Sequence, residues 1–395
     1  MSLTSRLKSN QNPTRLYFEE NFPAKKNFTQ EWKRRTKDLP SILPQDPSSL
    51  YPWSLVGHAI DYRIRLFFKK YSISDTVAKN GFLLIFSSES EINEADLIKQ
   101  QQTKHLLSEL EEEFENITKE IVGKLKSSDI ERRIAKCCLV LSYAETQVRS
   151  NRPSEPLLHT NTLEDLFSEM SETVIDDLVN LFHSFFESDK PSSNIVVLNP
   201  TFVGSRDVGG ADGDIILDHI LWDFKATKNP SEFKHLFLPY QLIGYALLDY
   251  DDRYALKGCG VYLVRQACGI SWSLEELFSL LGSDPGIDIS AHRERFRNSI
   301  KSSDFCEARS VLPDRPDLPL SPARGHQEGK IYEEKEDLMQ QIRHLRTAHG
   351  LTLRGMADRL KVPEKEWNRI FNGNLRSSSI KILKEYVEKM ESWPK

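Results

Sequence analysis

The sequence predicts a mixed α/β core that carries a long helical block and is followed by a small helical domain. Three observations support this fold class. Short apolar runs between residues 191 and 275 are bounded by Gly, Pro, Asn and Asp, which is typical of strands. Between residues 91 and 190, apolar residues recur in a charged region at the three- and four-residue spacing of helices. Residues 331–395 show the same helical periodicity.

Length and composition limit the class of protein. The chain has 395 residues, enough for two or three domains, and its 39% hydrophobic and 28% charged residues describe a globular protein with a real core. No apolar run approaches the roughly 20 residues of a membrane span. The N-terminal residues lack the apolar block of a secretory signal. We therefore expect a cytoplasmic protein with no membrane partner.

The net charge is −5, which argues against a protein that coats nucleic acid over its whole surface but allows a local basic groove. The cysteines are odd in number and form no Cys-x-x-Cys pair, so we expect free, mostly buried thiols and no iron–sulfur cluster. They are Cys137, Cys138, Cys259, Cys268 and Cys306.

The order of domains follows from shifts in composition. Residues 1–50 are polar and rich in proline, which predicts an irregular arm with one short helix near residues 30–37. Residues 51–310 form the predicted core domain, with a helix at 53–71, a strand-like run at 81–88 and a helical insertion at about 91–190. The proline-rich residues 311–330 predict a linker before the last domain, 331–395. The arm's basic cluster is expected to be a solvated surface, with a phosphate-contacting arm as the alternative. It comprises Lys25, Lys26, Lys33, Arg34 and Arg35.

The segment from Gly209 to Lys228 carries the pattern richest in chemistry. Asp214 opens an apolar strand, Asp218 and His219 predict a tight turn, and a second strand ends in Asp223-Phe224-Lys225. In a hairpin of these strands, Asp214 and Asp223 lie near the same end. Side chains alternate along a strand, so Asp223 and Lys225 share one face.

This set suits the hydrolysis of a phosphodiester. Two carboxylates and a backbone carbonyl, that of Phe224, supply the hard oxygen ligands that Mg²⁺ or Mn²⁺ prefers. Such a metal lowers the pKa of bound water and neutralises phosphate charge. Lys225 would orient the water or stabilise charge in the transition state. The alternative is a surface hairpin that carries ordinary charges.

The segment resembles motifs II and III of the PD-(D/E)xK nuclease superfamily, and is closest to its RecB-like branch. That branch has Gln-x-x-x-Tyr on a following helix, which this chain matches with Gln241 and Tyr245. The resemblance implies a restriction-endonuclease-like core and adds both residues to the catalytic site. From the residues alone, Tyr245 could equally be a core aromatic and Gln241 a solvated polar residue.

Motif I of the branch is an upstream helix with Gly-x-x-x-His. Gly57 to Asp61 resembles it, but Asp61 stands where the histidine is expected. Asp61 is therefore either a metal ligand or the partner of Arg65, one helical turn further on. His58 is predicted to lie on the helix surface rather than to bind metal. Other acidic candidates for motif I are Glu169, Glu172 and Asp176.

The C-terminal residues 338–388 resemble the Cro/XRE helix-turn-helix family. Helices with Ile342, Leu360 and Val387 follow in the expected order, and the recognition helix would be residues 363–371. The resemblance implies base contacts from Glu364, Lys365, Asn368 and Arg369, and phosphate contacts from Arg354, Arg359, Lys361 and Arg376. The alternative is a helix-turn-helix that contacts protein or forms a dimer.

Together these features predict a Mg²⁺- or Mn²⁺-dependent deoxyribonuclease that the helix-turn-helix directs to DNA. One alternative is a DNA-binding regulator or scaffold with a catalytically inactive nuclease fold. Another is a ribonuclease of the same fold. A protein partner or self-association, through the helix-turn-helix or the helical insertion, is a further option. A nuclease with its own DNA-reading module suits defence against phage.

Overall fold

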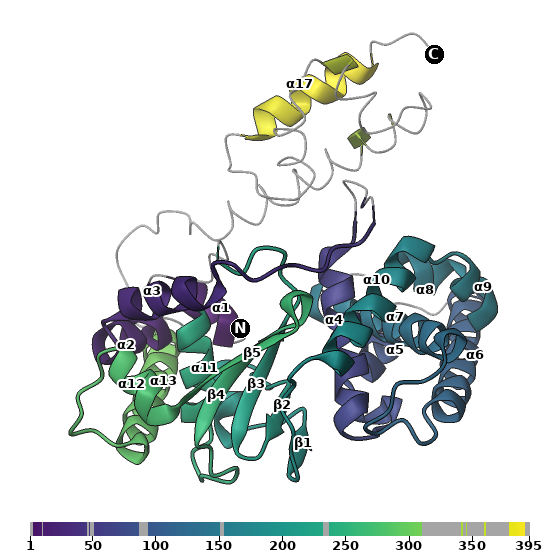
Figure 1. The fold of residues 1–395 in the computed structure, drawn as a ribbon. Coiled ribbons are helices and arrows are strands. Elements are labelled where there is room, and N and C mark those ends of the chain that lie inside the picture. Colours follow the sequence, from purple (N-terminus) through teal and green to yellow (C-terminus); the bar gives the residue numbers. More distant parts are fainter. Residues whose placement is uncertain are drawn as a thin grey trace. The chain divides into compact units, whose positions relative to one another are not determined.

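The computed structural model describes residues 3–9, 11–45, 47, 51–86, 94–150, 154–231, 237–309, 341–342, 345, 359–360 and 379–391. Contacts divide the chain into two compact units, residues 1–311 and 312–395. The first unit is a five-stranded sheet with helices on both faces, so the predicted α/β class is confirmed (Figure 1). None of the helices in these ranges is both long and apolar enough to cross a membrane.

The sheet has the order β1-β2-β3-β4-β5, and only the β3–β4 pair is parallel. The strands are β1 (Val196–Leu198), β2 (Ile215–Leu217), β3 (Ile220–Lys225), β4 (Gly258–Leu263) and β5 (Cys268–Ser273). The predicted β2–β3 hairpin is confirmed. Its turn residues Asp218 and His219 have φ of 46° and 71°, as a two-residue turn that matches strand twist requires. Helix α11 (Leu238–Leu248) connects the parallel strands β3 and β4.

Alternate side chains of the sheet enter two hydrophobic cores. Trp222 and Tyr262 belong to the first core, whereas Leu221 and Val261 belong to the second. The first core is completed by α4 (Trp53–Phe68), α5 (Val77–Phe86), α6 (Glu94–Ile117), α7 (Ser128–Ser150), α8 (Glu155–His159), α9 (Leu163–Ser168) and α10 (Glu172–Glu187). The second is completed by α1 (Leu3–Lys8), α2 (Pro13–Asn21), α3 (Lys25–Thr36), α11, α12 (Leu274–Leu280) and α13 (Ile289–Arg309).

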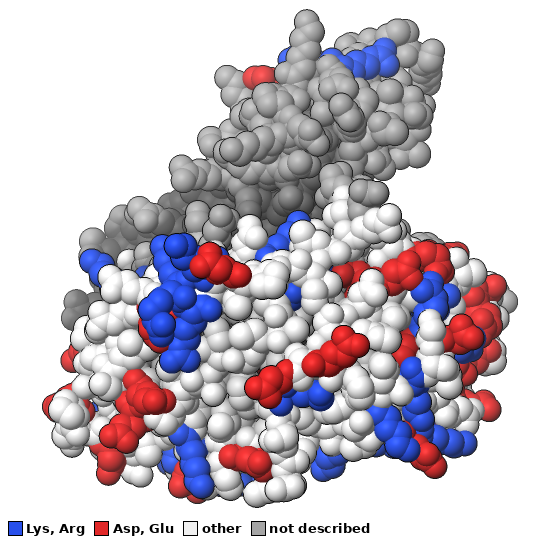
Figure 2. All heavy atoms as spheres, in the orientation of Figure 1, with Lys and Arg blue, Asp and Glu red and all other residues white. Residues whose placement is uncertain are grey.

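The prediction that residues 1–50 are mostly irregular was wrong, although the short helix expected near residues 30–37 lies within α3. This region forms α1, α2 and α3, whose Phe18 and Trp32 are buried in the second core. Pro13 does not break a helix there. It occupies the first turn of α2, after Asn12, whose side chain caps the helix. The basic residues of α3 are surface residues, as expected, and Figure 2 shows Lys and Arg side chains gathered where Figure 1 places this helix.

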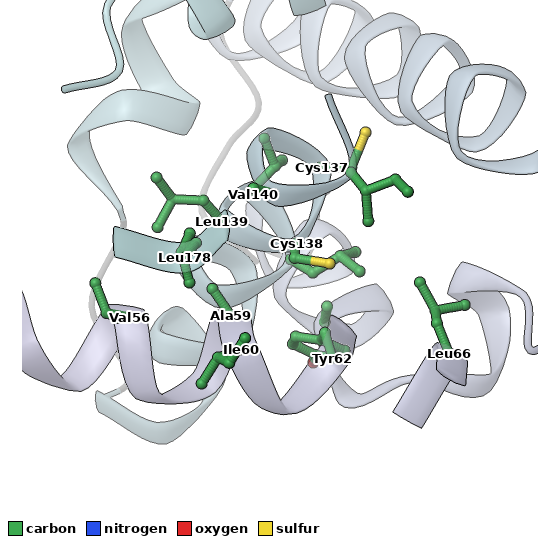
Figure 3. Packing of buried hydrophobic residues seen from close by; sticks show 14 of the residues in the cluster. Val56, Ala59, Ile60, Tyr62, Leu66, Cys137, Cys138, Leu139, Val140 and Leu178 are labelled. Carbon is green, nitrogen blue, oxygen red and sulfur yellow. The ribbon is translucent and has the colours of Figure 1, made fainter. Parts of the chain in front are cut away.

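The strand expected at residues 81–88 was also wrong, because residues 81–86 belong to α5. A short apolar run does not distinguish a strand from a buried helix. Gly81 lets α5 approach α7 closely: an added Cβ would lie 2.0 Å from the carbonyl oxygen of Ala144. The helices predicted between residues 91 and 190 are confirmed, and α7 packs along α4, where Cys138 and Leu139 lie near Ala59 and Tyr62 (Figure 3).

The second unit is described at only a few positions. Residues 341–342, 345 and 359–360 are helical, and α17 spans Ser379–Glu391, so the last predicted helix is confirmed. Ile342, Leu360 and Val387 are buried, as a packed helical domain requires. The predicted linker at 311–330 and the predicted recognition helix at 363–371 lie outside the described residues.

A buried ion pair joins the helical insertion to the end of the sheet. Arg265, just after β4, contacts both carboxylate oxygens of Asp177 on α10, at 3.0 and 2.7 Å, and both residues are at most 1% exposed. The same guanidinium donates to the backbone carbonyls of Ala226, after β3, and Ile42, before α4. Four segments that are far apart in the sequence therefore meet at one cation.

Asp177→Ala should lower the free energy of unfolding by about 3–5 kcal/mol, because it leaves the Arg265 charge buried without a partner. The neighbouring Asp176 is a matched control, since its side chain is 58% exposed in a surface ion pair. Asp176→Ala should cost no more than about 1 kcal/mol. Urea unfolding of both variants tests this. Equal losses for the two variants would contradict the role given to Asp177.

Candidate active site

A cavity of about 860 Å³ opens where β3 ends. The residue before β2, the end of β3, the loop after it, and the helices α4, α7 and α11 all contribute to its lining. Every residue predicted for the catalytic and metal site lines this one cavity: Asp61, Asp214, Asp223, Phe224, Lys225, Gln241 and Tyr245. The hairpin explains part of this, because β2 and β3 pair from Ile215 opposite Trp222 and so bring Asp214 beside the end of β3.

Asp214 is held by the strand beside it. Its Oδ2 accepts a hydrogen bond from the backbone N–H of Phe224, at 2.8 Å. The N–H and C=O of one strand residue point to the same side of the strand, so the carbonyl of Phe224 also points to the side that Asp214 occupies. One carboxylate and one carbonyl are therefore directed to the same place, as the sequence pattern suggested.

Asp223 and Lys225 form an ion pair in which Oδ2 lies 2.6 Å from Nζ. Asp223 is only 4% exposed, and its Oδ2 has no hydrogen bond of good geometry among the described residues. Burial raises the pKa of Asp223 to about 6; Lys225 opposes the rise and Asp214 adds to it. Burial alone would lower the pKa of Lys225, but the two carboxylates outweigh it and raise that pKa. Lys225 therefore stays protonated.

Helix α11 supplies the glutamine and the tyrosine. Nε2 of Gln241 donates to the phenol oxygen of Tyr245 at 3.0 Å. Tyr245 is 8% exposed, and its ring stacks on that of Phe202. Burial, followed by the charge of Asp223, raises the pKa of the phenol to about 12. Tyr245 is thus both a core aromatic and a protonated hydroxyl in the wall of the cavity.

Of the two roles considered for Asp61, the pairing with Arg65 is present: Nε of Arg65 donates to Oδ1 of Asp61 at 2.8 Å.

His58 was predicted to lie on the helix surface, and this was wrong. It lines the cavity, and its buried Nδ1 has no hydrogen-bond partner in the described part of the chain. Burial lowers the pKa of His58, with Glu145 opposing, which favours the neutral ring.

The other motif I candidates lie elsewhere. Glu172 and Asp176 pair with Arg132 at the surface, and Glu169 is exposed outside the cavity.

The sequence did not single out two residues of α7 that do line the cavity, Glu145 and Arg149. One signal was present. Glu145 continues the apolar stripe of Ile134, Cys138 and Leu141 at helical spacing, all of them buried. A carboxylate in a buried apolar stripe needs a charged or hydrogen-bonding partner, which indicates a polar site nearby.

The donors in the cavity can be tested for their fit to a metal. Within the described ranges, no group of three or more His, Cys, Asp or Glu side chains could hold a metal ion. The oxygens of Asp214, Asp223 and Phe224 are nevertheless the hard donors that Mg²⁺ and Mn²⁺ prefer. Oδ2 of Asp223 already lies 2.6 Å from the Lys225 ammonium, so a metal ion bound to this oxygen would have to share it with Lys225 or displace the ammonium. The oxygen donors fit a magnesium-type site that water or a phosphate completes.

The predicted DNA-contacting residues are almost all beyond what the structure describes. Arg359 is exposed at helical residues 359–360, whereas Arg354, Lys361, Lys365, Asn368, Arg369 and Arg376 lie outside the described residues.

Comparison of the chain with protein-family models, curated proteins and solved structures finds no match. What the cavity does must therefore be argued from its own residues.

The titration of Asp223 gives a pH test. Its folded pKa of about 6 exceeds the unfolded value of 3.8, so the folded state binds more protons between these values and stability falls as pH rises. We compare the unfolding free energy of the wild type with that of Asp223→Asn in metal-free buffer. The difference, wild type minus variant, should fall by roughly 2–3 kcal/mol from pH 4 to pH 7. Urea unfolding measures it. A difference that does not change with pH would contradict the raised pKa of Asp223.

Proposed function

We propose that this chain is a metal-dependent nuclease of the PD-(D/E)xK superfamily, of its RecB-like branch, that hydrolyses phosphodiester bonds in DNA. One observation carries the proposal. Residues chosen by motif spacing from a hairpin and from a separate helix, Asp214, Asp223, Lys225, Gln241 and Tyr245, line the same cavity. A surface hairpin with ordinary charges gives no reason for Gln241 and Tyr245 to lie beside it.

Asp214, Asp223 and the carbonyl of Phe224 would hold Mg²⁺ or Mn²⁺, with Asp61 or His58 as a further ligand. A bound metal of this kind supplies a water of lowered pKa and offsets the charge of the phosphate. The charge of Asp214 contributes to the raised pKa of Asp223, and a bound cation would favour the ionised Asp223 carboxylate. Asp61 would have to leave Arg65 to take part, whereas Nδ1 of His58 has no hydrogen bond to give up.

The other residues act on the substrate and the attacking water. Lys225 keeps its proton, so its ammonium can donate to the water or to charge that develops on the phosphate. Tyr245 also keeps its proton and can donate through its hydroxyl, which Gln241 holds in place. Burial raises the pKa of Asp223 to about 6 in the absence of metal, and a bound cation would favour its ionised form.

We also propose that the C-terminal unit is a Cro/XRE-type helix-turn-helix that brings the nuclease to DNA, in a role such as defence against phage. The helical residues 359–360 and α17, with Leu360 and Val387 buried, are consistent with that fold. The rival is a DNA-binding regulator with an inactive nuclease fold. The pairing of Asp61 with Arg65 favours the rival, because it occupies one of the expected ligands.

The nuclease proposal predicts that purified protein cleaves DNA with Mg²⁺ or Mn²⁺ and not with EDTA. Asp214→Ala, Asp223→Ala and Lys225→Ala should each lower kcat by about 100-fold or more, the usual loss when a group that stabilises transition-state charge is removed. Asp251→Ala and Lys257→Ala are matched controls, exposed and outside the cavity, and should cleave like wild type. The measurement is the rate of cleavage of linear and plasmid DNA.

The outcomes separate the candidates. Cleavage that survives all three substitutions would exclude this cavity as the active site. Absence of cleavage by the wild type on any DNA or RNA would favour the regulator. Cleavage of RNA in preference to DNA would identify a ribonuclease that uses the same residues.

A further inference from the structure

The helical insertion reaches the candidate active site through the last turns of α7. This helix packs along α4 (Figure 3). The Ser142 hydroxyl donates to the carbonyl of Leu55 at 2.9 Å. The contact fixes the C-terminal part of α7 beside the start of α4. Glu145 and Arg149 follow one and two turns later, and both line the cavity that contains Asp214 and Asp223. Part of the cavity wall therefore comes from the insertion.

Glu145 is buried behind Arg149. It is 3% exposed, and its Oε1 accepts from Nε of Arg149 at 2.7 Å. Burial raises the pKa of Glu145, but Arg149, His58 and a hydrogen bond with Tyr62 lower it more, so the carboxylate is ionised. A buried carboxylate on the same helix thus holds the Arg149 guanidinium at the cavity.

The exposed part of Arg149 lines the cavity, which distinguishes it from an arginine on an ordinary helix surface. Its side chain is 61% exposed and lines the cavity, while Glu145 contacts one edge of the guanidinium. Guanidinium has five N–H donors in a planar fork, so donors remain for a second anion. Two lysines also line the cavity: Lys225 pairs with Asp223, and Nζ of Lys228 lies 3.5 Å from the centre of the Trp53 ring.

A polyanion entering this cavity would meet several carboxylates before any metal offsets them. Asp212 and Asp214 line it together with Asp61 and Asp223. Arg149 on α7 adds a cation to this lining beyond Lys225 and Lys228, and it comes from a different element. Arg149 suits a phosphate because arginine binds phosphate in a bidentate manner and keeps its charge.

We propose that Arg149 is a substrate-positioning residue that binds a phosphate of the strand in the cavity, and that Glu145 orients it. This rests on the proposed nuclease function and gives the helical insertion a role in it. The structural alternative is a pair one turn apart that only stabilises the end of α7. The two differ in one respect: only the first makes Arg149 matter for nucleotide binding.

The test compares Arg149→Ala, Arg149→Lys and the control Arg253→Ala, whose arginine is exposed outside the cavity. The probe is thymidine bisphosphate, a single nucleotide too small to need a helix-turn-helix, titrated calorimetrically into the full-length protein with Ca²⁺ to prevent turnover. Arg149→Ala should weaken binding about tenfold, as the loss of one charge-assisted contact would. Arg149→Lys should recover part of the affinity, and Arg253→Ala should match wild type.

Steady-state cleavage of DNA with Mg²⁺ gives the second readout. Arg149→Ala should raise KM more than it lowers kcat, and its affinity for the bisphosphate should depend less on salt. Unchanged binding, salt dependence and KM would overturn the role of Arg149. If wild-type protein cleaves nothing, the nuclease proposal fails, but the bisphosphate titration still tests Arg149.

Loss of Arg149 also leaves Glu145 as a buried carboxylate without its partner, so the variant could unfold. The double variant Glu145→Gln with Arg149→Ala removes that charge as well. It should fold and show the same tenfold loss of bisphosphate affinity. Affinity of the folded double variant equal to that of wild type would contradict the proposal.

Discussion

The buried ion pair between Arg265 and Asp177 is the interaction on which the geometry of the cavity depends. A fully buried guanidinium is tolerated only where its charge and N–H groups are satisfied, and here one carboxylate and two backbone carbonyls do so. One of those carbonyls belongs to Ala226, the residue after Lys225. The ring of Trp53, which lines the cavity, lies 4.9 Å from the same guanidinium. The cation thus fixes the insertion, the end of β3 and the start of α4 together.

The charges of the cavity follow a consistent scheme. Asp61 is paired with Arg65 and Glu145 with Arg149, so two of its carboxylates are neutralised by cations on their own helices. Asp214 and Asp223 have Lys225 beside them, Arg149 adds a charge interaction with Asp214, and burial raises the pKa of Asp223. Negative charge is therefore undercompensated at the hairpin, on the side to which the Phe224 carbonyl points. We propose that a divalent cation would restore the balance there.

What could be predicted from the sequence was mostly local. The β2–β3 hairpin follows from Asp218 and His219 between two apolar runs, and the face shared by Asp223 and Lys225 follows from strand alternation. The resemblance to a known family then added Gln241 and Tyr245, which lie twenty or so residues away and do line the cavity.

The failures came from long-range packing. The first fifty residues were predicted to be mostly irregular because they are rich in proline. They form three short helices, which are stabilised by packing on the sheet face that carries Leu221 and Val261. Strand β5 was not predicted from the sequence. The direction of His58 and the approach of Glu145 depend on how α4 and α7 pack, which no local pattern encodes. Propensity and spacing place residues on an element, but the contacts between elements decide which face reaches the site.

The most direct measurement is an anomalous-difference map from crystals of the protein soaked in Mn²⁺. The structure predicts a peak in the cavity that contacts the carboxylates of Asp214 and Asp223 and the carbonyl of Phe224, and that is lost in Asp223→Ala. A map with no peak at these oxygens, or with Mn²⁺ bound only elsewhere, would contradict the assignment of this cavity as a metal-dependent active site.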